Sequence, residues 1–483
     1  MADYAFERRP NEPDANGILI MSDFFTLSFR PDIALTVESE RLILRSPQHC
    51  LTLEHPQPGL RTALERLKDS SQTFSQLQAV IAELDGIEAS LNFEFELQKL
   101  ISLGWISHSV LPLATAIAIA ENYQFVVPLF DEEQPLMLSR FAFLWQEKQQ
   151  FVLESPLSQA KIILLDWRAT ALIGKLAKVD SQFTFLTLAD GLIDAEIARA
   201  FMQLLIATKM IQLEPESKAL AEWQFHNLLF HRQTRLQRLD EPPKTEIPQF
   251  ENSERSHFVK SPMSDRVISL EKPNLEVLAQ TDISLTQAIE SRQSIREYSN
   301  QPITLSQLGE FLYRCARVKE VYIPEDDPMN IGEVTKRPYP CGGALYELEI
   351  YPVVNRCQGL DAGLYHYQPL AHRLHQLAEQ NPDVEALLYD AWKSTGQQDI
   401  PQVLLIVTAR FGRLFWKYHA IGYGLILKHI GVLYQTFYLV ATAMKLAPTA
   451  IGAGNSQLFD KIAHLNEHEE SSVGEFMLGS LKQ

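Results

Sequence analysis

The chain has 483 residues, more than one hydrophobic core usually contains, and this length predicts at least two domains. Its hydrophobic fraction of 46% and charged fraction of 21% are typical of a soluble globular protein. The net charge of −17 argues against nucleic acid or an anionic membrane as the main partner, because phosphate recognition requires a clustered basic surface.

The cysteines and the apolar segments indicate which kinds of site and which cellular location to expect. None of the four cysteines has CxxC or metal-ligand spacing, so we expect neither a metal site nor a disulfide framework. Residues 1–17 are polar and lack the apolar core of a signal peptide, which favours a cytoplasmic protein. The apolar stretch 420–447 has an uncharged run of 429–444 only, short of the roughly 20 apolar residues of a membrane span. We expect a core or interface helix there.

Residues 18–110 predict a small unit with strands first and helices after. Four short segments alternate apolar and polar residues, as half-buried strands do, and leucines and phenylalanines at helical spacing follow them. This order is that of a winged-helix-like α+β module. It recurs over 111–213, where Ser155-Pro156 corresponds to Ser46-Pro47 at an offset of 109 residues. We therefore interpret the two segments as copies of one module.

A connection and a larger domain follow. Residues 214–263 are predicted to contain an amphipathic helix that begins near Trp223 and then a proline-rich linker over 237–263. We predict one larger α+β domain over 264–483. A capping box at Thr304 opens a helix in it, and further elements are expected as strands at 345–354, 363–367 and 403–408 and a long helix at 418–446.

A turn with two glycines precedes the first of these strands, in the sequence RPYPCGGALYELEIY that begins at Arg337. Pro340 fixes its own φ, and Gly342 and Gly343 lack a Cβ. The backbone of this turn can therefore come close to a flat ligand and present N–H groups to it. For the turn taken alone, a plain loop is the more common alternative.

Arg292, Ser294 and Arg296 offer two forked cations and a hydroxyl over five residues. This set suits a phosphate and a polyhydroxyl chain, although the arginines alone would also suit a solvated helix end. A phosphate clamp combined with a flat-ring cradle matches the two ends of a site for flavin mononucleotide (FMN). Ile451 and Gly452, in the glycine-rich segment after the long helix, are a third candidate contact, with the end of a helix as the alternative.

Lys417 and Tyr418 are the candidate catalytic residues. Adjacent residues do not share a helix face, but at the start of a helix or in a loop both side chains can reach one cavity. A lysine beside a tyrosine favours the phenolate, and burial lowers the pKa of the lysine itself. Either group could then take a proton near neutral pH.

Residues 281–481 resemble the nitroreductase-fold flavoproteins, and among them the SagB-type azoline dehydrogenases, especially the cyanobactin oxidases. The matching stretches, in order, are SRQSIREYS, RPYPCGGALYELEIY, FWKYHAIGYG, QTFYLVATAM and AIGAG. The resemblance implies that Lys417 and Tyr418 carry catalysis. It also implies that the flavin phosphate and ribityl chain contact Arg292, Ser294 and Arg296, and that the isoalloxazine ring lies against Pro340, Cys341, Gly342 and Gly343.

Two positions depart from the family pattern. Cys341 stands where serine is usual, and Glu347 stands where the family often has proline. A thiol is a weaker hydrogen-bond donor than a hydroxyl, so the flavin contact expected at this position is weakened. Residues 18–213 resemble the small winged-helix elements that grip the leader of a precursor peptide, and no site motif accompanies that resemblance.

The implied activity is FMN-dependent oxidation of thiazoline rings, and also oxazoline rings, to azoles in a leader-bearing precursor peptide. A base would remove the ring Cα proton, hydride would leave Cβ for the flavin, and dioxygen would reoxidise the flavin. The fold implies a homodimer. The alternatives are a generic NAD(P)H-dependent flavin reductase and a non-catalytic scaffold that presents the precursor peptide to other enzymes.

Overall fold

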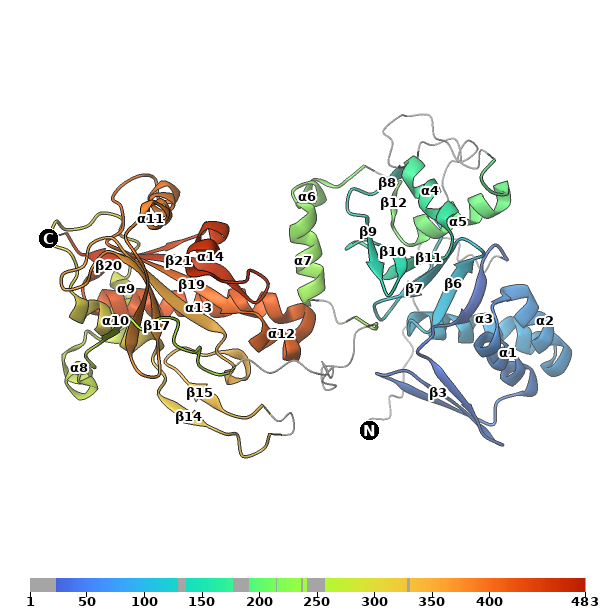
Figure 1. Ribbon diagram of the computed structural model, residues 1–483. Coiled ribbons are helices and arrows are strands. Elements are labelled where there is room, and N and C mark those ends of the chain that lie inside the picture. Colours follow the sequence, from blue (N-terminus) through green and yellow to red (C-terminus); the bar gives the residue numbers. More distant parts are fainter. Residues whose placement is uncertain are drawn as a thin grey trace. The chain divides into compact units, whose positions relative to one another are not determined.

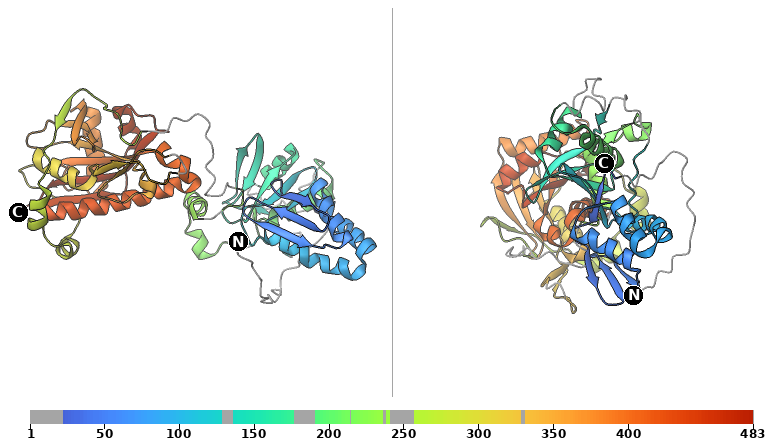
Figure 2. Two further views of the ribbon diagram at one scale, coloured as in Figure 1. Left: turned by 90° about the horizontal axis from the view of Figure 1, so that it is seen from below. Right: turned by 90° about the vertical axis from the view of Figure 1, so that its right-hand side faces the viewer.

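The structure is a computed structural model that describes residues 23–128, 136–176, 191–213, 215–235, 238–240, 257–327 and 331–482. It divides into two compact units, Met1–Glu246 and Ile247–Gln483, which are described separately (Figures 1 and 2). Most of the predicted proline-rich linker, positions 241–256, lies outside the described residues.

The first half of the N-terminal unit has strands followed by helices, as the sequence predicts. Helices follow the first strands, as predicted. Thr73 caps one of these helices, because its hydroxyl accepts a hydrogen bond from the Gln76 N–H at 3.3 Å. The elements are β1 (Thr26–Phe29), β2 (Ala34–Val37), β3 (Arg41–Arg45), β4 (Cys50–Glu54), α1 (Pro58–Asp69), β5 (Gln72–Thr73), α2 (Phe74–Asp85), α3 (Ile87–Ser102) and β6 (Ile106–Val110).

The second half repeats this order. In the first half, β3 and β4 pair Ile43 with Thr52, and in the second half, β10 and β11 pair Leu153 with Ile162, each partner 110 positions further along the chain. This agreement supports the predicted duplication. The elements are β7 (Ala114–Ala118), β8 (Met137–Leu138), β9 (Phe143–Glu147), β10 (Gln150–Glu154), β11 (Ala160–Leu164), α4 (Trp167–Leu176), α5 (Ala195–Ala207) and β12 (Ile211–Gln212).

The two halves share one sheet, in the order β5-β1-β6-β7-β11-β10-β9. Because β7 pairs with both β6 and β11, apolar residues from both halves, such as Leu27, Leu97 and Ile162, enter a single core. The boundary expected between residues 110 and 111 therefore falls between neighbouring strands of one sheet. The expectation of two separate modules is therefore corrected, because the copies are two halves of one unit. The recurring order of elements in the sequence carries no information about how strands of the two copies pair.

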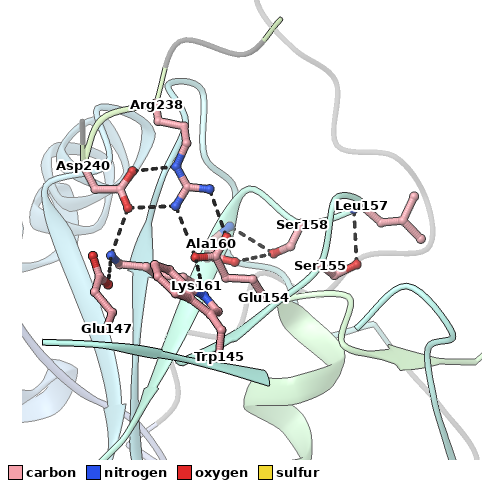
Figure 3. A network of polar contacts seen from close by, with 10 residues as sticks. All are labelled: Trp145, Glu147, Glu154, Ser155, Leu157, Ser158, Ala160, Lys161, Arg238 and Asp240. Atoms are coloured by element: carbon pink, nitrogen blue, oxygen red, sulfur yellow. Dashed lines mark hydrogen bonds and ion pairs between the residues drawn. The ribbon is translucent and has the colours of Figure 1, made fainter. Parts of the chain in front are cut away.

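The connecting segment is partly attached to the N-terminal unit. It contains α6 (Lys218–Ala221) and the predicted amphipathic helix, α7 (Phe225–Arg235). Arg238 is buried and pairs with Glu154 at 2.9 Å and with Asp240 at 2.8 Å (Figure 3). The N–H of the buried Leu239 donates to the Ile119 carbonyl at 3.0 Å. Residues 238–240 are thus docked, whereas the sequence predicted a linker there.

The C-terminal unit contains an antiparallel sheet that is buried on both faces. Along β16 and β19, Ile350 and Leu405 lie in one core, and their neighbours Tyr351 and Ile406 lie in another. The strands predicted at 345–354, 363–367 and 403–408 are confirmed as β16, β17 and β19. In sheet order the strands are β13 (Val267–Ser269), β18 (Arg373–Glu379), β17 (Gly363–Gln368), β16 (Leu348–Val354), β19 (Val403–Arg410), β21 (Glu470–Ser480) and β20 (Leu446–Ile451).

Helices cover both faces of this sheet (Figure 1). The core that contains Ile350 also contains residues of α10 (Leu305–Ala316) and α13 (Gly422–Ala443), and the opposite core contains α11 (Pro382–Ser394) and α14 (Ser456–Ala463). The capping box at Thr304 is confirmed, with the Gln307 N–H at 3.1 Å from its hydroxyl. The remaining elements are α8 (Leu275–Thr281), α9 (Leu285–Ser291), α12 (Gly412–Tyr418) and the hairpin β14 (Glu320–Tyr322) with β15 (Val334–Lys336).

The long helix predicted over 418–446 is present as α13, but it begins four residues later than predicted because a break separates it from α12. Helix α12 ends at Tyr418, a 3₁₀ turn follows, and α13 begins at Gly422. His419 adopts a φ of 40°, in the left-handed region. A Cβ at Gly422 would lie 2.6 Å from the Phe415 ring, so the glycine allows the two helices to pack closely at the break.

Among the described residues, one helical stretch, Gly412–Ala443, is long and apolar enough to cross a membrane by length and composition alone. Within it, α13 packs against α10 and β20 and buries Ile426, Leu433 and Phe437. Figure 2 shows α13, in orange, running along one face of the C-terminal sheet. This packing is that of the core helix predicted from the sequence.

Candidate active site

The glycine turn before β16 lies beside the two candidate catalytic residues. Gly343 has a φ of 62°, a conformation that favours glycine. The position of a Cβ on Gly343 is 2.9 Å from Lys417 Nζ and 3.1 Å from Tyr418 Oη. Pro340 and Gly343 are exposed, and Lys417 and Tyr418 are half-buried. The end of α12 therefore aims an amine and a phenol at the surface of the turn.

The turn does not present all its N–H groups to a ligand, as the sequence had suggested. The Gly342 N–H donates to His429 Nε2 at 3.0 Å. His429 lies on α13, far along the chain, so a local reading of the turn could not find this partner. The expectation of a free N–H at Gly342 is therefore corrected.

Cys341 faces the protein rather than open solvent. Its thiol donates to Glu347 Oε2 at 3.2 Å, and its sulfur accepts from the Tyr346 N–H at 3.2 Å. Burial and the neighbouring Glu347 carboxylate raise the pKa of the Cys341 thiol, which keeps it protonated. Glu347 Oε1 also lies 2.7 Å from His429 Nδ1. The two positions that depart from the family pattern are thus in direct contact.

Cys341, Glu347 and His429 each place one ligand-type atom within 4.8 Å of the others, a spacing that could hold a metal ion. The separations of 2.7 and 3.2 Å are those of hydrogen bonds. A protonated thiol is also a poor ligand, because metals bind the thiolate. We therefore assign these residues to a hydrogen-bonded network.

The ionisation of Tyr418 differs from the sequence-based expectation. Burial raises the pKa of Tyr418, and the neighbouring Cys341 and Glu347 add to the effect. Lys417 Nζ lies 5.5 Å from the centre of the Tyr418 ring, which is a contact with the ring face rather than with the hydroxyl. The prediction that the lysine favours a phenolate is wrong for this structure, in which Tyr418 is a neutral phenol and can donate a hydrogen bond.

The arginine and serine motif lies around a tyrosine that the sequence analysis did not single out. Ser294 Oγ is 2.8 Å from Tyr438 Oη, and the Arg292 guanidinium lies 5.1 Å from the centre of the same ring. The Ala450 N–H donates to Tyr438 Oη at 2.8 Å. Tyr438 therefore joins the motif to the end of β20. Its place in the matched stretch QTFYLVATAM was the only signal that could have identified it.

The other members of this group have different exposures. Arg296 is half-buried, and its carbonyl accepts from the Asp399 N–H at 3.3 Å. The Ile451 side chain is buried in the core, so only its backbone can serve a ligand, whereas Gly452 is exposed and has open space where a Cβ would be. Two residues later, a Cβ on Gly454 would overlap the carboxyl of Glu475. Burial raises the pKa of Glu475 to about 7, and Asp390 adds to the effect.

The candidate residues form two clusters at different points of α13. His429 lies at the glycine turn and Tyr438 at the arginine motif, nine residues further, which is about 13.5 Å along a helix axis. The first cluster offers a glycine surface with an amine and a phenol. The second offers two arginines, a hydroxyl and an exposed glycine. These are the donors and the surface that a phosphate and a flat ring require, so the residues fit a flavin mononucleotide.

Sequence models of three families match the chain. A model described as the ThcOx helix-turn-helix domain matches residues 21–127, and one described as cyanobactin oxidase ThcOx matches 136–240. A model of the nitroreductase family matches 289–480. The chain thus combines matches to both cyanobactin oxidase models with a nitroreductase domain. It is therefore an oxidoreductase, with an N-terminal helix-turn-helix domain and a C-terminal domain of a flavin-binding fold.

Relatives of the C-terminal domain are found in archaea and bacteria. A nitroreductase of Methanocaldococcus jannaschii, MJ1384, is 26% identical over 42% of this chain and 92% of its own length. The Microcin B17-processing protein McbC of Escherichia coli is 32% identical over 23% of this chain and 42% of its own length. Among solved structures, a Ralstonia eutropha nitroreductase covers 47% of this chain and 94% of its own, with 20% identity and a TM-score of 0.36.

The E. coli microcin synthetase McbBCD complex with truncated pro-MccB17 bound is a further structural neighbour of this oxidase. It matches 42% of this chain and 74% of its own chain, with 20% identity and a TM-score of 0.33.

Proposed function

We propose that this oxidase converts thiazoline rings, and also oxazoline rings, of a precursor peptide to the aromatic azoles, with FMN as its cofactor. The observation that carries the proposal is the convergence of Lys417 Nζ and Tyr418 Oη on the Gly343 surface, at 2.9 and 3.1 Å from the position of a Cβ. A flat ring that rests on this glycine has a proton acceptor and a donor beside it. The matches to the two cyanobactin oxidase models support the reaction class.

FMN, when bound, supplies the two-electron acceptor for this oxidation. Arg292, Ser294 and Arg296 would hold its phosphate and ribityl chain. Its ring would lie against Pro340, Cys341, Gly342 and Gly343, and the backbone of Ile451 and Gly452 would complete the site. Dioxygen would be the final electron acceptor.

The chain's own contribution to the reaction is proton transfer and positioning. Oxidation of an azoline removes a proton from Cα and a hydride from Cβ. Because burial keeps Tyr418 protonated, we assign it the role of a hydrogen-bond donor that orients the ring. Lys417 is then the proton acceptor, since its amine is the second group that faces the turn.

The N-terminal unit would bind the leader of the precursor peptide. The sheet β2-β3-β4 ends at β4, so within the described residues the outer edge of β4 has no strand partner. Such an edge can accept a peptide strand through backbone hydrogen bonds. A peptide partner of this kind is consistent with the cyanobactin oxidase family, and we place the enzyme in the cytoplasm.

The experiment that tests the proposed function is an anaerobic reduction of the purified protein. The protein should be yellow, and an azoline-bearing peptide should bleach the flavin absorption band while azole forms in equal amount. Rapid bleaching by NAD(P)H together with no reaction with the peptide would instead identify a generic flavin reductase. A colourless protein that does not take up FMN would identify a scaffold.

A further inference from the structure

A buried chain of hydrogen bonds connects β16 and α13 to the glycine turn. Glu347 is fully buried just before β16, and His429 is 7% exposed on α13. Glu347 Oε1 is 2.7 Å from His429 Nδ1, and His429 Nε2 accepts from the Gly342 N–H at 3.0 Å. The Cys341 thiol donates to the second oxygen of Glu347 at 3.2 Å. Every polar atom of the Glu347 and His429 side chains thus has a partner.

These contacts determine which nitrogen of His429 carries the proton. A backbone N–H is always a donor, so Nε2 must be the acceptor and cannot carry a proton of its own. Nδ1 then carries the proton and donates it to Glu347, as in the pairs in which a carboxylate fixes the tautomer of a histidine. His429 is therefore a neutral imidazole with Nδ1–H, held in one orientation from both sides.

The same pair sets the position of the surface that Lys417 and Tyr418 face. The position of a Cβ on Gly342 is 3.5 Å from His429 Nε2 and 3.4 Å from Tyr418 Oη. A displacement of Gly342 therefore changes the clearance of the Tyr418 hydroxyl directly, and that of Lys417 through Gly343. Misplacement of reacting groups by about 1 Å can lower a rate by about 10²-fold.

We propose that Glu347 and His429 are positioning residues, which fix the glycine turn at the distance from Lys417 and Tyr418 that the reaction requires. The role in catalysis rests on the proposed function. The hydrogen bond from Gly342 to His429 is independent of the proposed function, because it is a property of the folded chain. The pair acts through Gly342 and Cys341, so neither residue needs to touch the substrate.

The test compares His429→Phe with a matched control, His366→Phe. His366 forms a second buried pair in the same unit, with Nε2 at 3.2 Å from Glu349 Oε2. Deuterium exchange of the Gly342 amide, measured by mass spectrometry on peptides that span 337–346, should be at least about tenfold faster in His429→Phe and unchanged in His366→Phe. Glu347→Gln keeps an acceptor for Nδ1–H and should keep most of the protection.

Two further readouts distinguish positioning from a general loss of stability. With FMN bound, His429→Phe should alter the visible circular dichroism of the flavin and lower the rate of flavin reduction at saturating peptide by about 10²-fold, whereas His366→Phe should change neither. Equal exchange at Gly342 in His429→Phe and the parent protein overturns the proposal. Stoichiometric metal in the parent that is lost from His429→Phe also overturns it.

The parent protein provides a measurement that needs no variant. Nitrogen-15 spectra of protein labelled only in histidine should show His429 as the Nδ1–H tautomer, and an Nε2–H tautomer overturns the proposal. The exchange and tautomer measurements require neither flavin nor peptide. They therefore remain decisive if the protein does not oxidise azolines.

Discussion

The Cys341 thiol donates a hydrogen bond to the Glu347 carboxylate, with Sγ 3.2 Å from Oε2. These are the two positions at which the turn departs from the pattern of the family it resembles, and the structure places them in direct contact. A buried carboxylate at position 347 needs donors, and the thiol supplies one of them while His429 supplies the other.

The first prediction concerns this contact. Cys341→Ala leaves one oxygen of the buried Glu347 without its donor and should lower the free energy of unfolding by about 1–3 kcal/mol. Cys341→Ser restores a stronger donor and should unfold near the parent midpoint in urea. Equal destabilisation by both substitutions would mean that the volume of the sulfur, not its hydrogen bond, is what matters.

The second prediction concerns the flavin phosphate. Arg292→Ala combined with Arg296→Ala should release FMN, because each charge-assisted contact contributes roughly 1.5–3 kcal/mol, or about tenfold to hundredfold in affinity. The measurement is the dissociation constant of FMN by fluorescence titration. Arg266→Ala removes an arginine from the exposed pair with Glu379 and is the control that should retain flavin. Unchanged occupancy in the folded double variant would reject the assignment.

The third prediction separates proton transfer from cofactor binding. Lys417→Ala and Tyr418→Phe should stay yellow and lose azole formation by about 10²- to 10⁴-fold, the usual contribution of general acid–base catalysis. Stopped-flow mixing without oxygen should place the loss in flavin reduction. Lys428→Ala, an exposed lysine on α13, serves as the control. If both variants reduce flavin at the parent rate, the base lies elsewhere, with His419 the nearest candidate.

The fourth prediction tests a site shared between two protomers. The arginine cluster and the glycine turn occupy different points of α13, and in a homodimer one protomer's arginines would serve the other's Lys417. Mixing the Arg292→Ala, Arg296→Ala variant with Lys417→Ala should then restore about one quarter of the parent activity, because half of the dimers are mixed and each has one intact site. A site within one protomer would give no recovery.

The fifth prediction is a pH dependence of stability from Glu475. Its folded pKa is raised to about 7, so the stability that the neutral carboxyl contributes is complete below its unfolded value near 4.5 and is lost as pH rises to about 7. The loss should amount to roughly 3 kcal/mol, at about 1.4 kcal/mol per pKa unit. Glu475→Gln should remove this slope in urea unfolding of the flavin-free protein. A slope that persists would assign it to another group.

Local patterns in the sequence identified most elements of the fold. The alternation of β1 to β4, the capping box at Thr304 and the apolar run of β19 depend on residues close in the chain, and each is present in the structure. The candidate residues for the flavin were likewise chosen from short motifs. The structure brings Lys417 and Tyr418 to the glycine turn, so the two motifs lie together as one site would require.

Most of the misses involve partners that are distant in sequence, whereas the break after Tyr418 is local. The break after Tyr418 depends on the close approach of Phe415 and Gly422, which helical periodicity does not reveal. The Gly342 N–H is taken by a histidine 87 positions away. The raised pKa of Tyr418 follows from burial against Cys341 and Glu347, whereas the sequence suggested only its neighbour Lys417. No periodicity or spacing encodes these contacts.

The sheet shared by the two halves of the N-terminal unit has a consequence for the transfer of this unit to other enzymes. A cut at residue 110 would expose the edge of β6, and an open strand edge invites aggregation. A cut before Arg238 would leave the buried Glu154 without its cation. A transferable N-terminal unit must therefore retain both halves of the shared sheet and extend through Asp240, so that recombination in nature or in the laboratory can move it only as one block.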